Sequence, residues 1–71
     1  MLDHRLIGAR IQAARTVQGL TLEQVADRAH LSPDALRAVE AGTRKLTAEA
    51  LCNLCNALGV GPDFLVRGWI D

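Results

Sequence analysis

Helix start and stop signals divide this sequence into short segments, and the apolar residues inside each segment recur at helical spacing. Hydroxyl side chains stand before three segments, where they can accept hydrogen bonds from the free backbone amides of a helix start. Glycines stand after three segments, where they can take the positive φ that often ends a helix. The starts are Thr21, Ser32 and Thr47, and the ends are Gly19, Gly42 and Gly59. These start and stop signals predict a set of short helices.

The signals predict helices at about residues 3–18, 22–29, 33–41 and 47–59, and a short last helix that begins at 61–63. Thr21 and Gln24 form a Thr-x-x-Gln capping box, and Pro33 suits the first helical position after Ser32. The predicted inward residues are Ile7, Ile11, Ala14, Val25, Ala26, Ala29, Leu36, Val39, Leu51, Leu54, Cys55 and Leu58. In the third helix Asp34, Ala35, Arg37 and Ala38 are expected on the other faces.

Composition indicates an all-α class. The chain is rich in alanine and leucine, aromatic residues make up 3% and prolines number two, so residues that favour strands are few. Its 71 residues suffice for one domain, 1–71, and leave no room for a second, catalytic one. The predicted fold is a compact all-α bundle of about five short helices.

The eight basic and eight acidic side chains cancel, which counts against a protein that binds polyanions through its overall charge. Any affinity for nucleic acid must therefore come from a local patch. We find no export signal, no apolar run long enough to cross a bilayer and no arrangement typical of a catalytic site or a small-molecule substrate. These features predict a non-enzymatic protein that does not insert into a membrane.

Cys52 and Cys55 stand three residues apart without a second pair, so they cannot form the disulfide framework of a small secreted domain. This favours a reducing, cytoplasmic setting. A CxxC pair can be half of a metal site, but His4 and His30 fit no ligand spacing. We expect core packing for Cys55, a partly exposed or interfacial Cys52, and neither metal nor cofactor; a thiol or metal sensor is the alternative.

Two short helices joined by about three residues, at about 22–41, have the sequence form of a helix-turn-helix. Ala26 lies in the first of these two helices. It fits this arrangement because the helix at 33–41 crosses close above it, where a larger side chain would push the two helices apart. The order of residues across the chain then resembles the phage repressor and Cro (XRE) family of helix-turn-helix proteins. The resemblance covers about residues 6–66 and rests on Ile7-Gly8-Ala9-Arg10-Ile11, Arg15, Gly19-Leu20-Thr21, Val25-Ala26, Leu31-Ser32, Leu36, Val39-Glu40-Ala41-Gly42, Leu51, Leu54 and Ala57-Leu58-Gly59-Val60.

This resemblance implies a lambda repressor-like fold and a transcriptional regulator that binds double-stranded DNA as a homodimer on an inverted repeat. The length and the stretch Thr43-Arg44-Lys45-Leu46-Thr47 are also similar to the small controller proteins of restriction-modification operons. A protein-interaction module, such as an antitoxin or adaptor that retains the fold, is the alternative, since fold alone does not fix function.

The resemblance also implies roles for particular residues. Arg15 is expected to pair with Glu40 and fix the first helix against the third, the alternative being an ordinary exposed pair. Arg44 and Lys45 are expected to contact phosphates, the alternative being a solvated loop. Base reading falls to the exposed start and middle of the third helix, where an Asp34–Arg37 surface pair is the alternative. The full expected DNA-binding set is Thr21, Ser32, Pro33, Asp34, Arg37, Ala38, Arg44 and Lys45.

The sequence departs from the family at two positions. Leu22 stands where the family usually has a glutamine that contacts DNA, so one contact is missing. His30 stands where the family's turn usually has a left-handed glycine, and histidine tolerates that conformation only moderately. We therefore expect a turn that is slightly strained or reshaped.

The C-terminal segment is too apolar for a free tail in so small a domain. Paired half-sites on DNA need two recognition helices about one duplex turn apart, which makes a two-fold dimer interface the functional interpretation. The alternative is that some of these side chains fold back onto the core. The residues concerned are Phe64, Leu65, Trp69 and Ile70.

Overall fold

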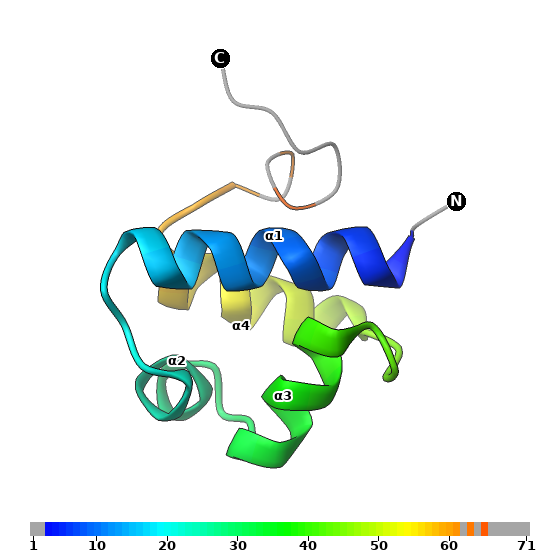
Figure 1. Cartoon of the computed structure of the whole chain (residues 1–71), viewed down its shortest axis with the longest axis horizontal. Helices are drawn as coiled ribbons and strands as arrows, with labels where there is room; N and C mark the ends of the chain where they lie inside the picture. The colour runs from blue at the N-terminus through cyan, green and yellow to red at the C-terminus, as the bar shows by residue number, and fades with distance from the viewer. Residues whose placement is uncertain (1–2, 62, 64, 66–71) are drawn as a thin grey trace.

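The computed structural model describes residues 3–61, 63 and 65, and within this part of the chain it contains helices and no strands. Helix α1 spans His4–Val17, α2 Leu22–Arg28, α3 Pro33–Ala41 and α4 Ala48–Leu58 (Figure 1). The all-α prediction is confirmed. Residues 63 and 65 are helical, and the rest of the predicted last helix lies outside the described residues. None of the helices described is long and apolar enough to cross a membrane.

Each helix begins at a polar side chain that accepts hydrogen bonds from backbone amides of its first turn. The Asp3 carboxylate caps α1, and the hydroxyls of Ser32 and Thr47 cap α3 and α4. Thr21 forms the predicted capping box, because its hydroxyl accepts from Gln24 N at 3.1 Å and its own N–H donates to Gln24 Oε1 at 2.8 Å. The starts of α2, α3 and α4 are therefore confirmed as local properties of the sequence.

Left-handed residues end the helices. Gly19, Gly42 and Gly59 have φ of 69°, 77° and 68°, as glycine permits. His30 takes the same role after α2 with φ 60° and is the one non-glycine residue of positive φ among those described. Leu31 N donates to Ala26 O at 2.8 Å across this turn, the bond that closes a Schellman motif. The turn keeps the left-handed geometry despite histidine, at the cost of the strain expected for a side chain there.

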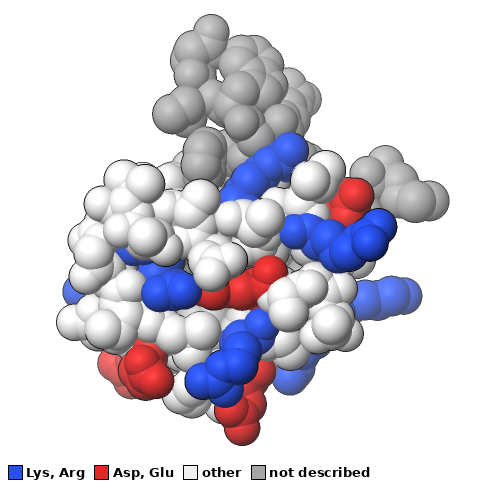
Figure 2. Space-filling model, viewed as in Figure 1, with Lys and Arg blue, Asp and Glu red and all other residues white. Residues whose placement is uncertain are grey.

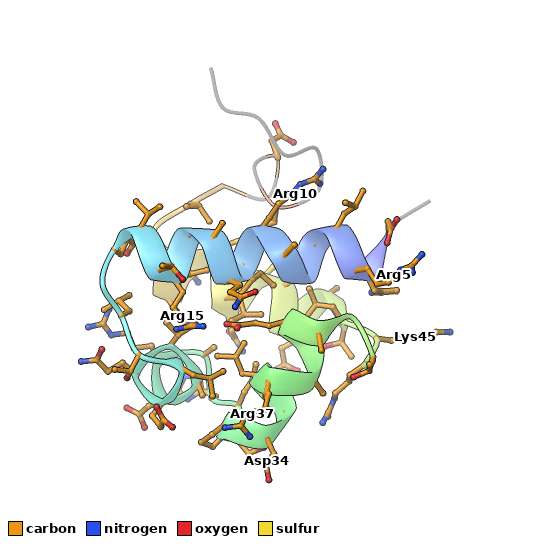
Figure 3. All side chains as sticks on the ribbon, in the orientation of Figure 1. Arg5, Arg10, Arg15, Asp34, Arg37 and Lys45 are labelled. Carbon is orange, nitrogen blue, oxygen red and sulfur yellow. The ribbon has the colours of Figure 1, made fainter. Side chains whose placement is uncertain are left out.

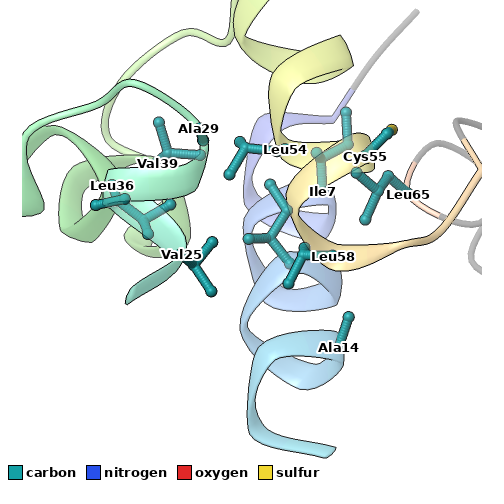
Figure 4. Close-up of a cluster of buried hydrophobic side chains, with 12 residues drawn as sticks. Ile7, Ala14, Val25, Ala29, Leu36, Val39, Leu54, Cys55, Leu58 and Leu65 are labelled. Atoms are coloured by element: carbon teal, nitrogen blue, oxygen red, sulfur yellow. The ribbon is translucent and has the colours of Figure 1, made fainter. Parts of the chain in front are cut away.

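The hydrophobic core lies where α1 and α2 both pack against α3 and α4 (Figure 4). Most inward residues predicted from spacing are buried, and Leu51 is half-buried against the same cluster. Ala35 corrects the prediction, because it was expected on an outward face and is buried. It stands beside Leu36 and one turn before Val39, so the three form one stripe that is wider than Leu36 and Val39 alone indicate.

A glycine brings α1 close to the end of α3. Gly8 is buried, and a Cβ atom added to it would collide with the carbonyl oxygen of Val39 and lie 2.7 Å from that of Glu40. The two backbones therefore approach more closely than any side chain at position 8 would allow. This contact fixes α1 across the C-terminal end of α3.

Candidate nucleic-acid interface

An ion pair between Arg15 of α1 and Glu40 of α3 supports the helix-turn-helix. Arg15 Nε donates to Glu40 Oε2 at 2.8 Å and Nη2 donates to Oε1 at 3.0 Å, so the contact is bidentate. Nη1 donates to the Leu20 carbonyl at 3.1 Å. The side chains are 16% and 7% exposed. Hydrogen bonding to Glu40 raises the pKa of Arg15, although burial opposes this. The contacts of the guanidinium join α1, Leu20 and α3.

The exposed face of α3 carries the expected base-reading residues. Pro33, Asp34 and Arg37 are exposed and Ala38 is half-buried. Arg37 Nη1 donates to Asp34 Oδ1 at 2.7 Å, with side-chain exposures of 62% and 93%, so the two residues form the i,i+3 surface pair that the sequence left open. Both side chains lie at the end of α3 farthest from α1 (Figure 3). A solvated pair with one hydrogen bond is worth less than about 1 kcal/mol, so a ligand can separate it readily.

The two hydroxyl residues of the expected DNA-binding set act as helix caps. The oxygens of Thr21 and Ser32 accept bonds from Gln24 N and Ala35 N, each at 3.1 Å, and both residues are exposed. Each hydroxyl hydrogen is a separate donor. Capping therefore leaves these residues able to donate a hydrogen bond to an acceptor such as a phosphate oxygen.

The loop between α3 and α4 presents Arg44 and Lys45, both exposed. Its start is fixed by Thr43, whose N–H and hydroxyl both donate to the Ala38 carbonyl, at 3.0 and 3.2 Å. Its end is fixed by Leu46, which packs against the core and donates its N–H to His4 Nδ1 at 3.4 Å. The cations thus extend from a loop whose two ends are held.

No sequence pattern indicated the contacts that α1 makes with this loop and with the C-terminal segment. His4 and Arg5 touch the loop, and Arg10 Nη1 donates to the Leu65 carbonyl at 3.1 Å. These partners are 37 to 55 residues apart, so neither helical spacing nor capping patterns could reveal them. On the face of the molecule seen in Figure 2, acidic side chains lie between the basic ones, as expected for a chain of balanced charge.

The cysteines differ in exposure. Cys52 is exposed and Cys55 is buried in the core. Burial, with a smaller effect of neighbouring Cys52, raises the pKa of the Cys55 thiol and so disfavours the thiolate that binds metals or attacks disulfides. No group of three or more potential metal ligands occurs among the described residues. The burial of Cys55 is explained by its packing in the core.

Of the four residues expected at a dimer interface, the structure describes Leu65. Its side chain has no exposed surface and belongs to the core. For this residue the alternative interpretation holds, in which the C-terminal segment folds back onto the core. It is corrected from an interface residue to a core residue, because a side chain already enclosed by its own chain offers no area to a second one. Phe64, Trp69 and Ile70 lie outside the described residues.

Comparison with known proteins agrees with this geometry. Residues 6–66 match the family model described as a helix-turn-helix domain. A search of curated protein sequences gave no match. Among solved structures, the clp gene regulator ClgR of C. glutamicum is 28% identical with a TM-score of 0.87, and the match covers 94% of this chain and 87% of that one.

Two further structures show the same fold. The restriction-modification controller protein C.AhdI of Aeromonas hydrophila is 30% identical with a TM-score of 0.85, covering 89% of this chain and 96% of its own. The P22 c2 repressor, solved with a synthetic operator, is 28% identical with a TM-score of 0.84, covering 90% and 97%. The chain therefore belongs to the helix-turn-helix family, and within it to the phage repressor and Cro type.

Proposed function

We propose that this chain is a sequence-specific DNA-binding regulator of transcription that acts as a homodimer on an inverted-repeat operator. The observation that carries the proposal is the combination of a rigid and an open part of α3. The Arg15–Glu40 pair holds the end of the helix, while Pro33, Asp34 and Arg37 stay exposed at its start. A recognition helix needs this arrangement, because its exposed residues must enter the major groove from a fixed frame.

Particular side chains suit particular DNA groups. Arg37 can offer its two-pronged donor to guanine O6 and N7, and Asp34 can accept from cytosine N4. Arg44 and Lys45 can neutralise phosphates beside the groove and so set the register without reading sequence. Thr21 and Ser32 can add hydroxyl donors, and the apolar contact of Ala38 suits a thymine methyl group.

Dimerisation follows from the geometry of an inverted repeat, which requires two recognition helices about one duplex turn apart. Phe64, Trp69 and Ile70 remain the proposed apolar contacts between copies. Sedimentation equilibrium of the full chain should give twice the monomer mass at micromolar concentration. Footprinting should give two half-sites whose centres are separated by about 10 base pairs or a multiple of that. A monomer that protects a single half-site would contradict the dimer.

Selection of bound sequences from random duplexes tests the DNA-binding proposal directly. We expect one enriched motif with two-fold symmetry. Arg37→Ala should weaken binding to the selected duplex by about 1–3 kcal/mol more than binding to a random duplex. Equal losses on the two duplexes would remove Arg37 from base reading. No binding at micromolar protein and moderate salt would instead favour a protein-interaction module, which the 93%-exposed carboxylate of Asp34 at the start of α3 also suits.

A further inference from the structure

We propose that the first turn of α1 is the second half of a phosphate-binding clamp, in which Arg5 binds the DNA backbone together with Arg44 and Lys45. In this clamp His4 is a positioning residue that holds the α3–α4 loop against α1. The inference rests on the proposed function and deepens it, because it adds a binding residue and a positioning residue outside the helix-turn-helix.

Consecutive residues of α1 contact the two ends of the loop. Arg5 lies directly against Gly42, because a Cβ atom added to that glycine would be 2.7 Å from Arg5 Cα and 2.5 Å from its Cγ. His4 Nδ1 accepts the hydrogen bond from Leu46 N–H at 3.4 Å. The intervening residues, Thr43 to Lys45, are exposed. The loop is thus seated on α1 at both ends with its two cations directed outward.

The packing of the loop on α1 brings exposed cations together in a chain whose net charge is zero. Arg5 is exposed, and Figure 3 shows it at the same end of the molecule as Lys45, where α1 begins and the loop turns. The acidic group nearest in sequence is Asp3, whose carboxylate accepts from the backbone N–H groups of Arg5 and Leu6. Arg44 and Lys45 have Glu40 and Glu49 four residues away in sequence, and the Glu40 carboxylate is held by Arg15. Arg5, Arg44 and Lys45 thus form a local group of exposed cations, which a chain of zero net charge needs to bind a polyanion.

The salt dependence of DNA binding tests the role of Arg5. Arg5→Gln keeps most of the stem that packs on Gly42 and removes the charge, whereas Arg5→Lys keeps the charge. With a random-sequence duplex of about two helical turns, we expect Arg5→Gln to reduce the slope of log affinity against log salt by about 0.9. Arg5→Lys should restore the slope. Arg28→Gln is the control, because it removes one exposed cation from a different helix, α2.

The role of His4 is tested by exchanging its acceptor. His4→Ala removes the acceptor for Leu46 N–H, while the Oδ1 atom of His4→Asn can replace Nδ1. We expect His4→Ala to weaken binding of random and selected duplexes by the same factor, and His4→Asn to recover most of the loss. Thermal unfolding followed by circular dichroism confirms that each variant is folded under the assay conditions.

The outcomes separate this inference from the proposed function. If the unmodified chain binds DNA and Lys45→Ala lowers the salt slope while Arg5→Gln does not, the clamp is overturned and the proposed function stands. Equal affinities of the unmodified chain and His4→Ala overturn the positioning role. If the unmodified chain binds neither duplex, the proposed function fails and the clamp fails with it.

Discussion

The two arginine–carboxylate pairs of α3 have similar bond lengths and very different surroundings. Arg15 and Glu40 join residues 25 apart in sequence, form two bonds of 2.8 and 3.0 Å and are largely withdrawn from water. Asp34 and Arg37 join neighbours on one helix through a single bond of 2.7 Å and are largely solvated. Water can replace the partners in the Asp34–Arg37 pair, whereas it has little access to the Arg15–Glu40 pair. Bond length alone therefore does not rank them.

The difference separates the two tasks of α3. Its C-terminal end is fixed to α1 by the Arg15–Glu40 pair and by the close backbone contact at Gly8. Its N-terminal end keeps charged side chains whose mutual contact is weak enough to exchange for a ligand. Breaking the fixed end should lower stability, and changing the open end should alter binding with little effect on stability.

Removal of Glu40 should have the largest effect on stability. Glu40→Ala leaves the Arg15 guanidinium, which is 16% exposed, without its bidentate partner, and we expect the free energy of unfolding to fall by about 3 kcal/mol. Urea denaturation followed by circular dichroism measures the change. Asp27→Ala, which removes an exposed carboxylate from α2, is the control and should stay within about 0.5 kcal/mol of the unmodified chain. A loss below about 1 kcal/mol for Glu40→Ala would make the buried pair no stronger than an exposed one.

A methyl group at position 8 should have the next largest effect. The Cβ of Gly8→Ala meets backbone carbonyls of Val39 and Glu40, which cannot turn aside as a side chain could, so α1 and α3 must separate. We expect a loss of about 2 kcal/mol, in the range of overpacked cores. Gly61→Ala is the matched control, because no atom of the described residues lies within 4 Å of an added Cβ there. Similar melting temperatures for the two variants would show that the helices can move apart without cost.

Local signals predicted most of the fold. The caps Thr21, Ser32 and Thr47 act over three residues, so their hydrogen bonds are encoded where they form. Ala35 was misplaced because two inward residues do not define the width of a buried stripe.

The site depends more heavily on contacts between distant segments. Arg15 and Glu40 were paired only through a family resemblance, since no periodicity links residues 25 apart. The contacts of His4 and Arg5 with the α3–α4 loop, at 37 to 42 residues, had neither a local signal nor a resemblance to indicate them. Local patterns therefore predict the elements of such a site, and tertiary packing decides which of its side chains meet.

The turn between α2 and α3 should be stabilised by glycine. His30 has φ 60°, a conformation that costs a residue with a Cβ atom more than it costs glycine. The greater freedom of an unfolded glycine offsets part of the gain, so His30→Gly should raise the free energy of unfolding by about 0.5 kcal/mol. Gly59→Ala is the converse control: its φ is 68° and no described atom lies within 4 Å of an added Cβ, so a loss there measures backbone strain. A destabilised His30→Gly would show that the imidazole makes a contact worth more than the strain.

The smallest change in stability is expected at the open end of α3. Asp34→Asn removes one charge from a pair whose side chains are 62% and 93% exposed, and the free energy of unfolding should change by less than about 0.5 kcal/mol. Binding should respond more strongly, because the carboxylate repels phosphates and holds Arg37 in the free protein. We expect tighter binding of a random duplex in fluorescence anisotropy at fixed salt. Weaker binding confined to the selected duplex would show instead that Asp34 accepts a hydrogen bond from a base, in which case the pair is exchanged on binding rather than merely removed.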